Sequence, residues 1–145
     1  MKPLPPDKNG IVYSQIEVNG VNSLVLVDGT ILEEAFCWQD RYILLFVINN
    51  LGFEELLFIY LFDTKINKIV DEARIGNLYA YDFVSDLQVI SEDTIFFKFI
   101  TKYGWILKLF DQPVRTFPFS FKHFFSIKRP FSSIRYFSVV PNNER

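Results

Sequence analysis

The feature that most constrains this chain is its succession of short apolar segments separated by turn residues. Between residues 86 and 110 the turn sequences Ser91-Glu92-Asp93 and Tyr103-Gly104 recur roughly every 10–12 residues, a spacing typical of antiparallel sandwiches and barrels. The longest apolar runs, Tyr42–Ile48 and Leu56–Phe62, are seven residues each, whereas a membrane helix needs about 20. The sequence therefore predicts an all-β fold of antiparallel meanders, with no membrane-spanning helix.

Two glycine-containing turns near the start predict a three-stranded meander. Asn19-Gly20 separates Ile11–Val18 from Val21–Val27, and Asp28-Gly29 precedes Thr30–Trp38. Asn-Gly and Asp-Gly favour tight hairpins because these residues tolerate positive φ. If both turns have two residues, opposite partners include the pairs Val18/Val21 and Val27/Thr30, and one face carries the expected core residues Ile16, Val18, Val21, Val25, Val27, Leu32 and Phe36.

The strands expected after the meander include one that is apolar along its whole length. Arg41–Ile48 is predicted to be a strand buried on both faces or a strand at a sheet centre. Glu55–Phe62 is also predicted as a strand, although the opening Phe53-Glu54-Glu55-Leu56-Leu57 fits a helix start as well. The other predicted strands are Lys68–Arg74, Asp86–Ile90, Thr94–Thr101, Gly104–Phe110, Val114–Phe119, Phe121–Ile127 and Ser133–Val140.

Size and composition predict a single domain, 1–145, that folds in a reducing compartment. The 145 residues are 50% hydrophobic and 18% aromatic, which excludes intrinsic disorder. Three prolines make residues 1–9 an extended lead-in. The first residues have no apolar core of the kind that a signal peptide needs. One cysteine forms no internal disulfide, so we expect a cytoplasmic protein.

A faint repeat suggests how the strands are grouped. Asp40–Ile48 echoes Glu92–Ile100 at an offset of 52, and Tyr60–Asp63 echoes Lys108–Asp111 at an offset of 48. A strand, a turn and a strand ending in Leu-Phe-Asp resembles one β-propeller blade, but propellers need about four to eight blades. The pattern favours two antiparallel meanders packed as a sandwich, or as a propeller-like pair of sheets. Chance similarity between two apolar hairpins is the alternative.

Side chains for catalysis or metal binding are scarce. His123 and Cys37 are the single histidine and the single cysteine, and Cys37 between two aromatic residues is expected to be a small core residue. Zinc sites take three or four protein ligands. The sequence contains neither a nucleophile elbow nor a glycine-rich phosphate loop. We therefore expect a non-enzyme that needs no cofactor and no metal.

The charge is distributed unevenly along the chain. Residues 1–93 hold six Lys/Arg and fifteen Asp/Glu, a net charge of −9, while residues 94–145 hold nine Lys/Arg and two Asp/Glu, a net charge of +7. One interpretation is that the two halves offset each other in the fold. The other is an acidic surface that receives a basic partner. The candidate partner-binding residues are four acidic doublets, Glu33-Glu34, Glu54-Glu55, Asp71-Glu72 and Glu92-Asp93.

Two structural interpretations compete with partner binding. The first is that the doublets are charged strand ends that prevent edge-to-edge pairing, the interpretation that the residues themselves favour. Near the C-terminus, cations alternate with aromatic residues in a pattern that single-stranded nucleic acid binders use. The same alternation fits a hairpin with aromatic side chains inward, and the pI of about 5.4 argues against a nucleic-acid binder. The cations concerned are Lys122, Lys128, Arg129 and Arg135.

In general character the chain resembles the immunity proteins of bacterial contact-dependent inhibition and related polymorphic toxin systems. It is small, aromatic-rich, β-rich and acidic over much of its length, and the resemblance involves no shared motif. It implies a tight complex with a cognate protein toxin domain, often a nuclease, whose basic cleft an acidic surface blocks. The alternatives are an interaction module of a larger assembly and a small-ligand-binding β-barrel. Nucleic acid and membranes are not expected as partners.

Overall fold

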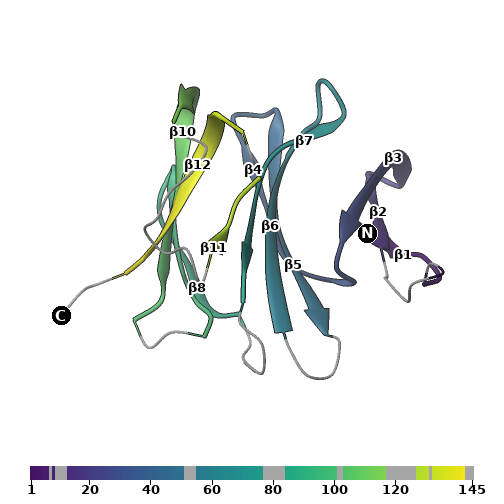
Figure 1. The fold of residues 1–145 in the computed structure, drawn as a ribbon. Helices are drawn as coiled ribbons and strands as arrows, with labels where there is room; N and C mark the ends of the chain where they lie inside the picture. Colours follow the sequence, from purple (N-terminus) through teal and green to yellow (C-terminus); the bar gives the residue numbers. More distant parts are fainter. Residues whose placement is uncertain are drawn as a thin grey trace.

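The computed structural model describes residues 1–6, 8, 13–50, 55–76, 84–100, 103–116, 127–130 and 132–142. The described residues form three antiparallel sheets and no helix, which confirms the all-β prediction. Figure 1 shows the sheets as three layers, whereas the sequence suggested a pair. None of the three sheets closes on itself, so the barrel considered as an alternative is not the architecture. No described helix is long and apolar enough to cross a membrane.

The central layer, sheet B, is the most deeply buried. Its strands lie in the order β11-β7-β6-β5-β4. Leu44 and Phe46 on β5 face one neighbouring layer, while Leu45 and Val47 face the other, and all four are at most 5% exposed. The prediction of burial on both faces is thus confirmed for Leu44–Ile48, while Arg41, Tyr42 and Ile43 are partly exposed. The strands of sheet B are β4 (Ile31–Trp38), β5 (Tyr42–Asn50), β6 (Glu55–Asp63), β7 (Lys68–Ile75) and β11 (Ile127–Lys128).

Sheet A covers one face of sheet B. The hairpin at Asn19-Gly20 forms as predicted, with Val18 opposite Val21. Ile16 and Val27 are buried against sheet B, but Val21 is 69% exposed and takes no part in the core. The expected lead-in contributes a two-residue strand at the sheet edge. The strands of sheet A are β1 (Lys2–Pro3), β2 (Tyr13–Val18) and β3 (Val21–Asp28).

The predicted second hairpin, at Asp28-Gly29, is wrong. β3 does not pair with β4, because Gly29 carries the chain out of sheet A and into sheet B. At this crossing Thr30 N–H donates to the Ile48 carbonyl at 3.1 Å, and the Ser14 hydroxyl donates to the Gly29 carbonyl at 2.6 Å. Gly29 has φ +98, and an added Cβ would lie 2.6 Å from Val47 Cγ1. The dipeptide thus provides positive φ and a close approach to sheet B, rather than a hairpin.

Sheet C covers the other face of sheet B, in the order β12-β10-β9-β8. Trp105, Phe97 and Phe137 are at most 1% exposed and form the centre of the core between sheets B and C. The register of β10 with β12 shifts between Leu109 and Val114, so the predicted strand Val114–Phe119 starts as a continuation of β10. The strands are β8 (Ser85–Ser91), β9 (Thr94–Lys98), β10 (Trp105–Arg115) and β12 (Ile134–Pro141).

Four of the predicted strands lie partly outside the described residues. The undescribed parts are the first two residues of Ile11–Val18, the last residue of Thr94–Thr101, the end of Val114–Phe119 and all of Phe121–Ile127 except its last residue. The Glu55–Phe62 strand is confirmed as β6, and the segment 51–54 just before it lies outside the description.

The faint sequence repeat does not correspond to a structural repeat. Ile43 pairs with Phe62 across β5 and β6, while its counterpart Ile95 pairs with Leu107 across β9 and β10. In the sequence repeat the counterpart of Phe62 is Phe110, which lies three residues after Leu107, the residue that pairs with Ile95. Because side chains alternate between faces, an odd shift turns the second Leu-Phe-Asp to the opposite side of its sheet. Chance similarity between two apolar hairpins therefore explains the echo.

Candidate functional site

Strand β4 forms one edge of sheet B, with β5 on one side and no described strand on the other. Along its eight residues every second pair of backbone N–H and C=O groups faces the open side. Ile31 and Leu32 at its start are 44% and 40% exposed. An edge of this length with apolar side chains is the kind of surface onto which another strand pairs.

Glu33 and Glu34 lie on this edge, and both are exposed. The register shifts between Leu32 and Glu34, so Glu33 has no partner on β5 and forms a β-bulge. The Ala35 N–H donates to Glu34 Oε1 at 3.3 Å, which holds that carboxylate against the backbone of its own strand. A bulge and negative charges oppose pairing with an identical edge. A strand carrying Lys or Arg would instead meet the opposite charge.

The Asp71-Glu72 doublet is divided between the two faces of β7. Asp71 lies opposite Leu61 and faces sheet C, whereas Glu72 lies opposite Tyr60 and faces sheet A. The Asp71 side chain is 1% exposed, so its expected role as a surface contact is wrong. The alternation of side chains along a strand separates neighbouring residues in this way.

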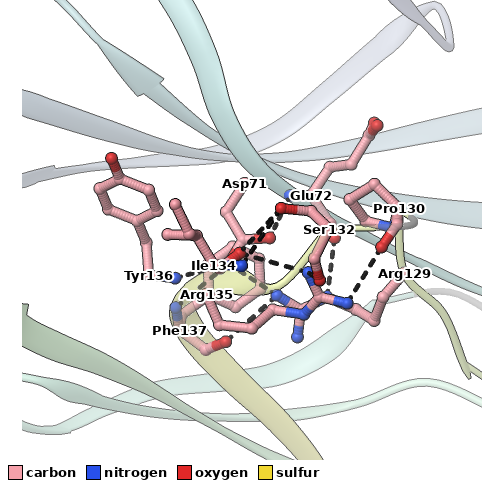
Figure 2. A network of polar contacts seen from close by, with 9 residues as sticks. All are labelled: Asp71, Glu72, Arg129, Pro130, Ser132, Ile134, Arg135, Tyr136 and Phe137. Atoms are coloured by element: carbon pink, nitrogen blue, oxygen red, sulfur yellow. Dashed lines mark hydrogen bonds and ion pairs between the residues drawn. The ribbon is translucent and has the colours of Figure 1, made fainter. Parts of the chain in front are cut away.

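Figure 2 shows the polar network in which the Asp71 carboxylate lies. Asp71 Oδ2 accepts hydrogen bonds from Arg129 Nη2 at 2.7 Å and from the backbone N–H groups of Tyr136 and Phe137 at 2.8 and 3.3 Å. Arg129 also donates to the carbonyls of Glu72 and Phe137, and its guanidinium lies 4.5 Å from the Phe137 ring centroid. The network joins β7 of sheet B to β12 of sheet C.

The network also determines the environment of the C-terminal cations. Arg135 is 8% exposed and donates to the carbonyls of Pro130, Ser132 and Ile134. Burial lowers the pKa of this guanidinium. Arg129 and Arg135 are therefore bound within the protein, while Lys122 lies outside the described residues.

Of the three ion pairs in the described residues, Arg129–Asp71 and Lys98–Asp86 join the acidic and basic parts of the sequence, so the two halves partly offset each other.

The Glu92-Asp93 doublet forms the turn between β8 and β9. Asp93 accepts hydrogen bonds from the hydroxyls of Thr94 and Ser91 at 2.8 and 2.9 Å, and these bonds lower the pKa of its carboxyl group. Asp93 thus stabilises its own turn, while Glu92 is exposed.

Glu54 and the side chain of Glu55 lie outside the description. Within the described residues the doublets do not gather into one acidic rim, and Glu33-Glu34 is the doublet with both side chains exposed on a strand.

Asp63 at the end of β6 forms a second buried ion pair. Its two carboxylate oxygens accept from Arg41 Nε at 2.9 Å and Arg41 Nη2 at 2.6 Å, and its side chain is 1% exposed. The hydrogen bonds from Arg41 hold the pKa of Asp63 below its ordinary value. This two-pronged geometry joins the turn before β5 to the turn after β6, where the Thr64 N–H also donates to the Arg41 carbonyl at 3.0 Å. Sequence patterns gave no sign of it.

Cys37 and His123, the single cysteine and the single histidine of the chain, do not form a pair that the structure describes. Cys37 lies on the edge strand β4 and is exposed, so the expectation of a core cysteine is wrong. The reason is that β4 is an edge, where a side chain between two aromatic residues still faces solvent. His123 lies outside the described residues. Among the residues that the structure describes, no three His, Cys, Asp or Glu side chains form a group that could hold a metal ion.

A cavity of about 300 Å³ lies between sheets A and B. Tyr60 and Glu72 contribute a cross-strand pair from sheet B, and Tyr13 and Asp28 contribute one from sheet A. The Tyr60 hydroxyl accepts from the Asp28 N–H at 3.1 Å and donates to the Asp28 carbonyl at 3.2 Å. The remaining lining residues are the apolar Leu26, Val27 and Ile69.

The electrostatic environment of this cavity disfavours the presence of two negative charges. Burial raises the pKa of Glu72, and the nearby Asp28 carboxylate raises it further, while Arg74 lowers it. Burial also raises the pKa of Tyr60 well above its ordinary value. Sequence analysis named Glu72 but missed Asp28 and the two tyrosines. The single polar tip within the apolar run of β6, Tyr60, was the signal that could have pointed to them, because buried tyrosine hydroxyls need partners.

Comparison with known proteins gave no match: no family model fits the chain, and neither a curated protein nor a solved structure is significantly similar to it.

Proposed function

We propose that this chain is a non-catalytic binding protein that receives a basic protein partner on the open edge of β4. The observation that carries the proposal is the eight-residue edge on which Glu33 and Glu34 are exposed beside the apolar Ile31 and Leu32. In binding by strand addition, main-chain hydrogen bonds give affinity and alternate side chains give specificity. Here the partner's cations would contact the two carboxylates.

The same carboxylates favour this partner over a second copy of the chain. Two β4 edges placed together would bring Glu33 and Glu34 of one copy near those of the other, and like charges across a strand pair are destabilising. A basic strand has no such cost and gains electrostatic steering during association. The features that discourage edge-to-edge aggregation therefore also select the partner.

The specific biological role that we propose is that of an immunity protein. Its partner would be a cognate toxin domain, and the acidic edge would block a cationic cleft such as a nuclease uses to hold phosphates. The general resemblance of the chain to immunity proteins of contact-dependent inhibition supports this role. A cytoplasmic location follows from it, since such a toxin acts inside the cell.

The proposal is tested by capturing the partner and then measuring its binding. Immobilised wild-type chain would capture the partner from the native source, with Glu33→Lys/Glu34→Lys as the control bait. The purified partner is then tested for association rate across a salt series. We expect the double reversal to slow association at least about tenfold at low salt and to flatten the salt dependence. Glu92→Lys, a single reversal at an exposed turn, is the control and should change the rate far less.

The immunity role has its own readout. Expression of the captured partner in bacteria should arrest growth, and co-expression of the wild-type chain should restore it. The double reversal should restore growth less well at equal protein level. A partner that is harmless to the cell would contradict the immunity role while leaving strand binding in place.

An interaction module within a larger assembly is the second candidate, supported by one observation. Strand β8 forms an open edge of sheet C, and Val89 and Ile90 on it are 58% and 57% exposed. A second open edge suits a protein that lies between two neighbours. A partner that requires both edges for binding would favour this role over the immunity protein.

A further inference from the structure

The cavity between sheets A and B combines three features that together suit one kind of ligand. Two acidic residues, Asp28 and Glu72, line it from opposite sheets, and the Asp28 charge acts on the Glu72 carboxylate. Two tyrosines, Tyr13 and Tyr60, lie directly across a strand pair from those carboxylates. Apolar side chains complete the lining. Figure 2 shows the Glu72 side chain directed away from the Asp71 network on the other face of β7.

Charged side chains lie near the Glu72 carboxylate, but none of the hydrogen bonds in the described part of the chain involves this carboxylate. Arg129 contacts the Glu72 carbonyl oxygen rather than its carboxylate, and it pairs with Asp71 on the opposite face. Arg74 is exposed and lies within 5.9 Å of the Phe58 ring centroid. The pKa of Glu72 is raised overall: burial and the Asp28 charge raise it, and each arginine taken alone lowers it less than either of these raises it. A cation bound in the cavity would relieve this excess of negative charge.

The shape and chemistry of the cavity select among cations. A divalent metal ion such as Ca²⁺ takes six to eight oxygen ligands, whereas the side chains of Leu26, Val27 and Ile69 in the lining offer none and the Tyr60 hydroxyl is already bonded to the Asp28 backbone. A volume of about 300 Å³ is at the lower end for small-molecule sites and accommodates a short aliphatic chain. Aromatic faces next to carboxylates bind ammonium groups by cation–π attraction and charge-assisted hydrogen bonds.

We infer that the cavity between sheets A and B binds an alkylammonium group, with Asp28 and Glu72 holding the charged nitrogen and Leu26, Val27 and Ile69 covering the aliphatic stem. Such a group occurs both as a free aliphatic amine and as the side chain of lysine in another protein. This inference does not rest on the proposed function. On sheet B the cavity is lined by β6 and β7, and on sheet A by β2 and β3, while β4 lies at an edge of sheet B, beyond β5.

The test is a titration of methyl-labelled protein with n-butylammonium chloride, followed by the NMR signals of Leu26 and Ile69. We expect saturable shifts of both residues, and none with 1-butanol, the neutral molecule of similar size. Glu72→Gln should weaken binding by roughly tenfold or more, because a hydrogen bond to a buried charge is lost. Asp28→Asn is the second variant in case the first fails to fold. Glu33→Gln removes the same charge from an exposed site and should bind as the wild type does.

Two further ligands distinguish a lysine side chain from a free amine, and an ammonium group from a metal ion. The titration is repeated with Nα-acetyl-lysine methylamide. Tighter binding of this compound than of butylammonium indicates a lysine side chain as the ligand, and equal or weaker binding indicates a free amine. Either result supports the site. The inference is overturned by equal shifts with 1-butanol, by unchanged binding in both carboxylate variants, or by shifts that appear with CaCl₂ and not with butylammonium.

Discussion

Arg129 donates to Asp71 across 2.7 Å, and through this ion pair the segment after β11 is held against both β7 and β12. Asp71 Oδ2 also receives the two backbone N–H groups at the middle of β12. One carboxylate oxygen therefore accepts three donors from residues more than fifty positions away in the sequence. It connects sheet B to sheet C at the side opposite the free β4 edge.

Replacing this carboxylate should destabilise the fold strongly. Asp71→Asn leaves the Arg129 cation, 17% exposed, without its counter-charge, and removal of one partner from a buried pair costs about 3–5 kcal/mol. The measurement is the free energy of unfolding in urea. The matched control is Asp86→Asn, which breaks the exposed pair with Lys98 and should cost at most about 1 kcal/mol. Similar losses in both variants would show that the buried network contributes no more than a surface pair.

Two glycines with positive φ should respond differently to alanine. Gly20 has φ +79 with nothing within 4 Å of an added Cβ, so Gly20→Ala should cost only the backbone strain, about 1–2 kcal/mol. Gly29→Ala adds a clash at 2.6 Å with Val47 in the core, and we expect a further loss of about 1–3 kcal/mol. Urea unfolding of the two variants measures the difference. Equal losses would mean that the passage from sheet A to sheet B is not tightly packed.

The Arg41–Asp63 pair predicts how stability depends on pH. The pKa of Asp63 is lowered in the folded protein from an unfolded value of 3.8, so its contribution is complete at pH values well above 3.8. The contribution is lost as the pH falls through the lower folded pKa, where the carboxylate is protonated in both states. The free-energy difference between wild type and Asp63→Asn should therefore be constant near neutral pH and shrink in acid. A difference that grows toward low pH would contradict this assignment.

Neutralising the edge should promote self-association. Glu33→Gln/Glu34→Gln keeps the size of both side chains and removes the like charges that oppose pairing of two β4 edges. Sedimentation velocity over a range of concentrations should show stronger association of this variant than of the wild type. Glu92→Gln, at an exposed turn, is the control. Unchanged sedimentation of the double variant would mean that the bulge at Glu33 alone protects the edge.

The sequence predicted strands well because period and composition are local. Leu44–Ile48 is apolar at every position, and only a strand covered on both faces buries all of them. It did not predict that Asp28-Gly29 leaves sheet A, because the same dipeptide fits a hairpin and a crossing, and packing against Val47 decides between them. The β4 edge was partly predictable, since Glu33 and Glu34 interrupt an otherwise apolar run.

The internal use of charged residues was not predictable from the sequence. Asp71 and Glu72 are identical in kind to the other acidic doublets. Only the distant approach of β12 to one face of β7 and of sheet A to the other places one carboxylate in a buried network and the other residue at a cavity. The partners Arg129 and Asp28 lie 58 and 44 residues away from the carboxylates they influence. Contacts of this range leave no periodic pattern in the chain.

Amide hydrogen exchange of the chain, alone and with its captured partner, tests the central claim most directly. If a basic strand pairs with β4, the backbone amides of Ile31–Trp38 that face the open side should exchange slowly in the complex and rapidly in the free protein. The amides of β6, already bonded on both sides within sheet B, should change little. Protection that appears on sheet C or on sheet A while β4 exchanges as before would contradict the claim that this edge receives the partner.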